Sequence, residues 1–139
     1  MIQKDYSKDF LNEAKIRLET ADFVLKKNAN AFCVRLSQEA VELSLKSALR
    51  LIGIDFPKWH DMGEVLTKEK SKFPNNFKEK ISKLAEISNL LVKFRETAMY
   101  GNAKGRKSPS MIFNKEIAEN ALNDAKYCVQ NVEELFSII

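Results

Sequence analysis

Apolar residues recur at three- and four-residue steps along almost the whole chain, and this spacing constrains the fold more than any other feature. The first repeat consists of Phe10, Ala14, Leu18, Ala21 and Leu25. Side chains at this spacing share one face of an α-helix. Only four glycines and three prolines occur in 139 residues, too few for the many turns of an all-β fold. We therefore predict an all-α protein.

Four such repeats predict four long helices, at about residues 7–27, 31–52, 76–100 and from 115 onward. Gly53 is placed to end the second helix, and Asn114 to cap the last one. The segment Asp61-Met-Gly-Glu64 has the spacing of a capping box and predicts a short additional helix. Because the joints are brief, successive long helices must reverse direction. We expect a single domain, 1–139, folded as an antiparallel up-and-down bundle of four long helices plus a short helix.

A second set of apolar residues lies off the main stripes of the first two helices. Its members are Ile16, Phe23, Cys33, Val41 and Leu45. Either the buried face is wide, or part of this set forms a self-association surface. The sequence leaves both interpretations open.

Several function classes receive no support from the composition. Cys33 and Cys128 lack metal-ligand spacing, and the chain has one histidine, so we expect buried cysteines, no metal and no cofactor. No apolar run approaches membrane-spanning length, and the N-terminus has no signal-peptide core, so a cytoplasmic location is expected. The net charge of +4 permits an anionic partner, but a lysine-rich solvated surface would give the same value.

The segment from Arg95 to Gly101 is the strongest candidate for a specific function. Arg95 continues the apolar stripe of its helix, and its guanidinium cannot lose its charge. It therefore needs a carboxylate, a carbonyl cluster or a phosphate as partner. In the purely structural alternative, Glu39 or Glu42 of the second helix holds Arg95. His60, at the entrance of the short helix, has no partner for base chemistry nearby in sequence and is interpreted as structural.

The loop after Gly101 is rich in glycine and positive charge. Its sequence, Gly101-Asn-Ala-Lys-Gly-Arg-Lys-Ser108, resembles a Walker A motif only superficially, because Arg106 replaces the second glycine and the loop joins two helices. We instead expect a mobile turn carrying Lys104, Arg106 and Lys107. Such cations could hold phosphate oxygens, or they could simply keep the loop solvated.

Four segments, in this order and spacing, resemble the HEPN family of small helical domains. They are the helix 37–46, the loop 53–60 with its glycine, proline and histidine, the segment 95–101 at the R-x4–6-H signature, and the alanine-rich helix 117–136. The resemblance implies a compact bundle that commonly pairs, bringing two arginine motifs together. Many members are metal-independent ribonucleases. Others are partners of minimal nucleotidyltransferases in toxin–antitoxin pairs, and some only bind nucleotides.

The chain departs from this family pattern at the histidine of the signature, which is Tyr100 here. A phenol has a pKa of about 10, so at neutral pH it is mostly in the wrong form to act as a base. It can still donate a hydrogen bond to phosphate or stack on a nucleobase. Phosphate binding therefore survives this replacement more easily than cleavage does.

Together these features predict a cleft in a homodimeric HEPN-like protein that binds a nucleotide or an RNA phosphate. The expected binding residues are Arg95, Tyr100, Lys104, Arg106 and Lys107. The resemblance further implies a nucleotidyltransferase as a protein partner. Two alternatives stay open. In one, the protein is a metal-independent endoribonuclease in which Arg95 stabilises the transition-state phosphate and Tyr100 acts as acid or hydrogen-bond donor. In the other, it is a non-catalytic antitoxin or adaptor.

Overall fold

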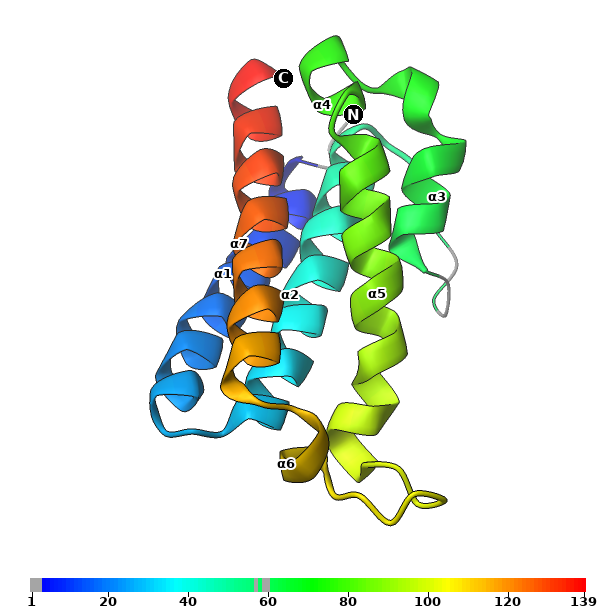
Figure 1. Cartoon of the computed structure of the whole chain (residues 1–139). Coiled ribbons are helices and arrows are strands. Elements are labelled where there is room, and N and C mark those ends of the chain that lie inside the picture. The colour runs from blue at the N-terminus through cyan, green and yellow to red at the C-terminus, as the bar shows by residue number, and fades with distance from the viewer. Residues whose placement is uncertain (1–3, 57, 59–60) are drawn as a thin grey trace.

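The computed structural model describes residues 4–56, 58 and 61–139, and it confirms an all-α bundle. The elements are α1 (Lys4–Lys26), α2 (Asn30–Leu51), α3 (Met62–Lys68), a short 3₁₀ turn η1 (Lys70–Lys72), α4 (Asn75–Lys78), α5 (Ile81–Tyr100), α6 (Pro109–Ile112) and α7 (Lys115–Ile138). The four long helices α1, α2, α5 and α7 alternate in direction along the chain (Figure 1). Within the described part of the chain, no helix is both long and apolar enough to cross a membrane.

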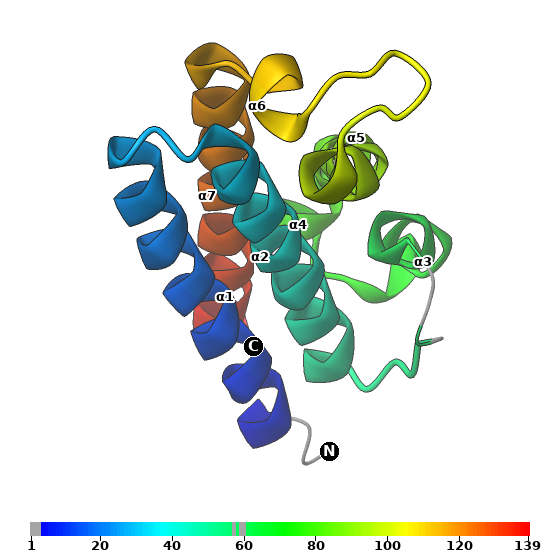
Figure 2. The same ribbon diagram turned by 90° about the horizontal axis from the view of Figure 1, so that it is seen from below.

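Helix α2 lies at the centre and contacts α1, α7, α5 and α3. Figure 2 shows α1 and α7 on one side of α2, with α5 and then α3 on the other. Because neighbours surround α2, its second apolar set, Cys33, Val41 and Leu45, is fully buried. For α2, the interpretation as a wide buried face is therefore correct. Ile16 and Phe23 of α1 are instead 52% and 61% exposed.

The ends of the first two helices follow directly from their sequences. Gly53 has φ +78°, and it donates to the carbonyl of Arg50 while Ile54 donates to that of Leu49. These two bonds form a Schellman motif, which requires a left-handed residue at this position. Asn28, with φ +62°, ends α1 in the same way. The predicted cap of α7 is also present, because the Asn114 side chain accepts from the Ile117 backbone N–H at 2.8 Å.

The long helix predicted from residue 76 is divided in two. Phe77 is buried within α4, and α5 begins only at Ile81. Between them the Lys80 N–H donates to the Phe77 carbonyl, an i to i+3 bond that tightens the turn and breaks the regular helical pattern. Phe77 also stacks on Phe73, with ring centroids 4.9 Å apart, which ties α4 to the preceding loop.

Helix α3 packs closely on α5 because Gly63 has no side chain. A Cβ atom at Gly63 would lie 2.8 Å from the Cα atom of Ala85, closer than real packing allows. Asp61 caps α3 as predicted, accepting from the Gly63 N–H at 2.9 Å, and it also accepts from the Ser88 hydroxyl at 2.6 Å. The start of α3 is thereby held beside the middle of α5. His60, interpreted above as structural, lies outside the described residues.

Candidate functional site

Arg95 stands where the buried stripe of α5 emerges from the bundle. Earlier members of the stripe, including Ser88 and Leu91, are buried, whereas the Arg95 side chain is 52% exposed. Val92 and Met99, three residues before and four after Arg95, are also 42% and 41% exposed. The start of α3 contacts α5 at Ala85 and Ser88, about two turns before Arg95. The guanidinium therefore reaches solvent at the edge of α2.

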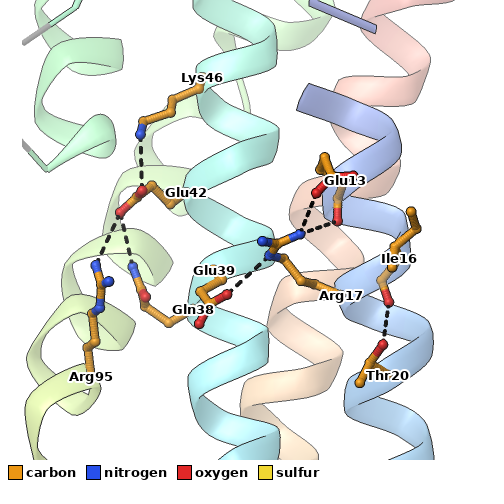
Figure 3. Close-up of polar contacts among 9 residues, drawn as sticks. All are labelled: Glu13, Ile16, Arg17, Thr20, Gln38, Glu39, Glu42, Lys46 and Arg95. Atoms are coloured by element: carbon orange, nitrogen blue, oxygen red, sulfur yellow. Dashed lines mark hydrogen bonds and ion pairs between the residues drawn. The ribbon is translucent and has the colours of Figure 1, made fainter. Parts of the chain in front are cut away.

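Glu42 of α2 is the side chain that faces Arg95, and Figure 3 shows three partners converging on it. Its Oε1 atom lies 3.8 Å from a terminal nitrogen of Arg95 and accepts from Gln38 Nε2 at 3.4 Å. Its Oε2 atom lies 3.1 Å from Lys46 Nζ. At 3.8 Å the Arg95 contact is an ion pair but exceeds hydrogen-bond length. Among the described residues, the five guanidinium N–H groups of Arg95 make no hydrogen bond.

Arg17, on the other flank of α2, provides an internal comparison. Its guanidinium donates to Glu39 at 3.1 Å and to Glu13 at 2.9 Å (Figure 3). Burial would lower the pKa of Arg17, but the hydrogen bonds and charges of these two carboxylates outweigh that effect and raise it. Thus Glu39 holds Arg17 and not Arg95. Of the two carboxylates offered by the structural alternative, Glu42 faces Arg95, and only at 3.8 Å.

A polar cleft of about 240 Å³ opens between α2, α5 and the start of α3. Its lining residues are Gln38, Glu42, Lys46, Lys58, Asp61, Val92 and Arg95. Both carboxylates in this set already have partners, because Glu42 meets Gln38, Lys46 and Arg95, while Asp61 accepts two hydrogen bonds. Three cationic side chains face two carboxylates, so the cleft favours an anionic ligand over a cationic one.

Tyr100 and the basic loop line a different hollow, of about 570 Å³, at the end of α5. Its lining residues are Glu96, Thr97, Tyr100, Gly101, Asn102, Ala103, Lys104, Lys107 and Ile112. Residues five apart on an α-helix point about 140° away from each other and lie about 7.5 Å apart along its axis. This is why Arg95 and Tyr100, although close in sequence, face different hollows of one chain. Arg106 lines neither the Arg95 cleft nor the hollow beside Tyr100.

The basic loop is a hydrogen-bonded hairpin. The backbone groups of Asn102 and Lys107 exchange two hydrogen bonds, at 2.8 and 3.0 Å, and the Asn102 side chain accepts from the Gly105 N–H. Arg106 has a left-handed backbone, with φ +54°, next to this bridge. Tyr100 is 73% exposed beside it. The hairpin therefore presents Lys104 and Arg106 at its tip, with an aromatic ring at its base.

The described residues contain no cluster of metal-binding side chains, and both cysteines are buried. No group of three or more His, Cys, Asp or Glu side chains there could hold a metal ion. Cys33 and Cys128 are both fully buried. Burial raises the pKa of Cys128 to about 12, so its thiol stays protonated at neutral pH.

The sequence interpretation identified Arg95 and gave Glu42 as one of its two candidate partners, but it did not assign the other lining residues to the site. Gln38, Glu42 and Lys46 are successive members of one i, i+4 row on α2, and only Glu42 was considered as a partner of Arg95. That row is the signal that could have indicated a polar wall. Lys58 and Asp61 gave no such signal, because their position in the cleft depends on how the start of α3 packs against α5.

Comparison with known proteins identified a matching family model and a solved structure of similar fold. The family model described as "HEPN domain" matches residues 7–135. The crystal structure of TT1696 from Thermus thermophilus is similar in fold, with a TM-score of 0.72 over 93% of this chain and 97% of that one, at 22% sequence identity. No functionally curated protein matches the chain significantly.

Proposed function

Because the chain belongs to the HEPN domain family, we propose that it binds the phosphate of a nucleotide or of an RNA strand at the cleft around Arg95. One observation carries the proposal. The Arg95 guanidinium is half exposed at the rim of a polar cleft, and its nearest described carboxylate, Glu42, lies 3.8 Å away. A phosphate is the ligand that best matches its unused, fork-shaped row of donors.

The second hollow fits a contact with a longer RNA strand. Tyr100 offers an exposed ring on which a base can stack, and the hairpin offers Lys104, Arg106 and Lys107 for backbone phosphates. Because Arg95 and Tyr100 face different sides of α5, a single nucleotide bound by one chain reaches only one of the two hollows. We therefore expect a mononucleotide to depend on Arg95, and an oligonucleotide to depend on Arg95 and on the hairpin.

Titration of the protein with adenosine 5′-monophosphate and with an eight-residue oligoadenylate tests both statements. Charge-assisted hydrogen bonds contribute about 1.5–3 kcal/mol each, so Arg95→Ala should weaken both ligands by about 10- to 100-fold. Arg95→Lys should restore little of the lost affinity, because lysine lacks the bidentate geometry of arginine. Arg35→Ala is the matched control, since Arg35 stacks on Phe32 and lies outside the cleft. Equal binding by the wild type and by Arg95→Ala would refute the proposal.

The hairpin has its own test. Replacement of Lys104, Arg106 and Lys107 by Gln should weaken the binding of the oligoadenylate and leave the binding of the mononucleotide unchanged. Each lost phosphate contact should also reduce the slope of log K against log salt concentration by about 0.7. If the slope of log K against log salt concentration did not change, the hairpin would not be part of the binding surface.

A second copy of the chain is part of the same proposal. Family members commonly pair, and Val92 and Met99 leave apolar surface exposed on both sides of Arg95. A twofold pairing at this face would bring two copies of the arginine motif together. Light scattering should give the mass of a dimer for the wild type and of a monomer for Met99→Glu. The same mass for both proteins would argue against pairing at this face.

A minimal nucleotidyltransferase is the protein partner that the family membership suggests, in the setting of a toxin–antitoxin pair. Co-purification with the product of an adjoining nucleotidyltransferase gene tests this. Failure of the two proteins to associate when they are expressed together would speak against it.

A further inference from the structure

Gln38 is the most buried polar side chain of the cleft, and only half of its amide has a partner. The residue is 2% exposed, and its Nε2 atom donates to Glu42 at 3.4 Å. Its Oε1 atom is buried and has no hydrogen-bond partner among the described residues. Exchanging the amide oxygen and nitrogen would place two acceptors against each other at Glu42, so the present assignment is the favourable one. A buried acceptor without a donor is rare and costly in native proteins.

The Gln38 amide, which carries the unsatisfied oxygen, lines the same cleft as Arg95. Gln38 and Arg95 approach the same atom, Oε1 of Glu42, from α2 and α5 (Figure 3). A ligand whose anionic group meets Arg95 therefore has its next few atoms near Gln38. To satisfy Gln38 Oε1, those atoms must include a hydrogen-bond donor.

We propose that Gln38 is a specificity-determining residue that accepts a hydrogen bond from a sugar hydroxyl of the bound nucleotide. The proposal rests on the phosphate-binding function proposed above and refines it. A ribose carries hydroxyl donors a few atoms from its phosphate, and a sugar without these hydroxyls has none to offer. The cleft therefore selects nucleotides that carry sugar hydroxyls over their 2′,3′-dideoxy counterparts.

The size of the cleft favours the sugar over the base as the source of the donor. Its volume is about 240 Å³, below the roughly 300–1,000 Å³ of pockets that enclose a whole drug-sized ligand. A sugar and its phosphate fit in this space, and the base then extends toward solvent. A base N–H group is the other source of the same donor chemistry, and the experiment below distinguishes the two.

Binding of three phosphates to the wild type and to a Gln38 variant tests the inference. The probes are adenosine 5′-monophosphate, its 2′,3′-dideoxy analogue and ribose 5-phosphate. Gln38→Met removes the acceptor at nearly constant volume, and Gln38→Leu serves as a second variant if the first does not fold, as judged by thermal unfolding. Ser37→Ala is the matched control, because Ser37 is also a buried polar residue of α2 but lies outside the cleft.

The wild type should bind the monophosphate about tenfold more tightly than the dideoxy analogue, the value of one net hydrogen bond. Gln38→Met should abolish this difference by weakening the monophosphate alone, and it should weaken ribose 5-phosphate equally. Ser37→Ala should retain the difference.

Three results would overturn the inference while phosphate binding stands: equal affinity of the wild type for the two nucleotides, a tenfold difference that persists in Gln38→Met, or ribose 5-phosphate binding that does not depend on Gln38. The last result would assign the donor to the base. If none of the three phosphates, nor the oligoadenylate, bound the wild type, the phosphate-binding function itself would fail, and this inference with it.

Discussion

Replacing Gly101 by alanine should destabilise the protein more than any other glycine-to-alanine change at a turn. Gly101 ends α5 with φ +74° and ψ −161°, a backbone conformation that essentially only glycine adopts. A Cβ atom there would lie 2.3 Å from the carbonyl oxygen of Lys107. That same oxygen accepts the hydrogen bond from the Asn102 N–H that closes the basic hairpin. The added methyl group therefore strains the backbone and also displaces the hairpin.

The two effects set the expected magnitude. Backbone strain of this kind costs about 1–3 kcal/mol. Displacing the Lys107 carbonyl breaks at least one bridging hydrogen bond, which contributes about 0.5–1.5 kcal/mol. Because the hairpin is exposed, it can open locally, and the loss cannot exceed the free energy that holds it closed. We therefore expect Gly101→Ala to lower the free energy of unfolding by about 2–3 kcal/mol.

Two other glycines distinguish the cost of backbone strain from the cost of a steric clash with the Lys107 carbonyl. Gly53 has a similar φ of +78°, but a Cβ atom there would meet nothing within 4 Å, so Gly53→Ala should cost only the left-handed strain of about 1–2 kcal/mol. Gly105 has no left-handed backbone and no atom closer than 3.5 Å, so Gly105→Ala should leave stability nearly unchanged.

Urea unfolding monitored by circular dichroism measures all three variants against the wild type. The order of destabilisation should be Gly101→Ala, then Gly53→Ala, then Gly105→Ala. If Gly101→Ala destabilised the protein no more than Gly53→Ala does, the Lys107 carbonyl would not lie as close to Gly101 as the structure shows. The 102–107 segment would then behave as the mobile turn expected from its sequence.

Four further outcomes follow from the packing. Gly63→Ala should destabilise by about 1–3 kcal/mol in urea unfolding, because its methyl group would collide with the Ala85 backbone, whereas a gain in stability would refute the close helix contact. Asn114→Ala should cost about 1 kcal/mol through loss of the α7 cap, and an unchanged midpoint would contradict this. Cys33 and Cys128 should resist iodoacetamide in the native state and react in guanidinium chloride, as counted by mass spectrometry. Burial raises the pKa of Cys128 from 9.0 to about 12, so stability should be unaffected below pH 9 and should decline as pH rises toward 12.

Local sequence signals accounted for the positions of most helix ends. Gly53 stops α2, Asp61 starts α3 and Asn114 starts α7, each through hydrogen bonds to residues two to four positions away. Such bonds depend on neighbours in sequence, so a pattern of single residues can predict them. The division between α4 and α5 was missed, since no glycine or proline marks it.

The surroundings of the candidate site were less predictable. The chemistry of Arg95 indicated a need for a partner, and Glu42 was one of two carboxylates considered. Which of them faces Arg95 depends on the rotation of α2 against α5, and this same rotation directs Glu39 to Arg17 instead. The buried amide of Gln38 became apparent only with its burial and its missing partner.

From the sequence alone follow the helical character of this protein, the places where most of its helices begin and end, and the importance of the charges of Arg95 and the hairpin. These properties follow from helical periodicity, capping and residue chemistry, all of which act over a few positions. The packing of the helices decided that α2 is central, that the Arg95 side chain is half exposed, and that Glu42, not Glu39, faces it. These features depend on how helices far apart in sequence pack against each other, and packing depends on the shapes of both partners at once.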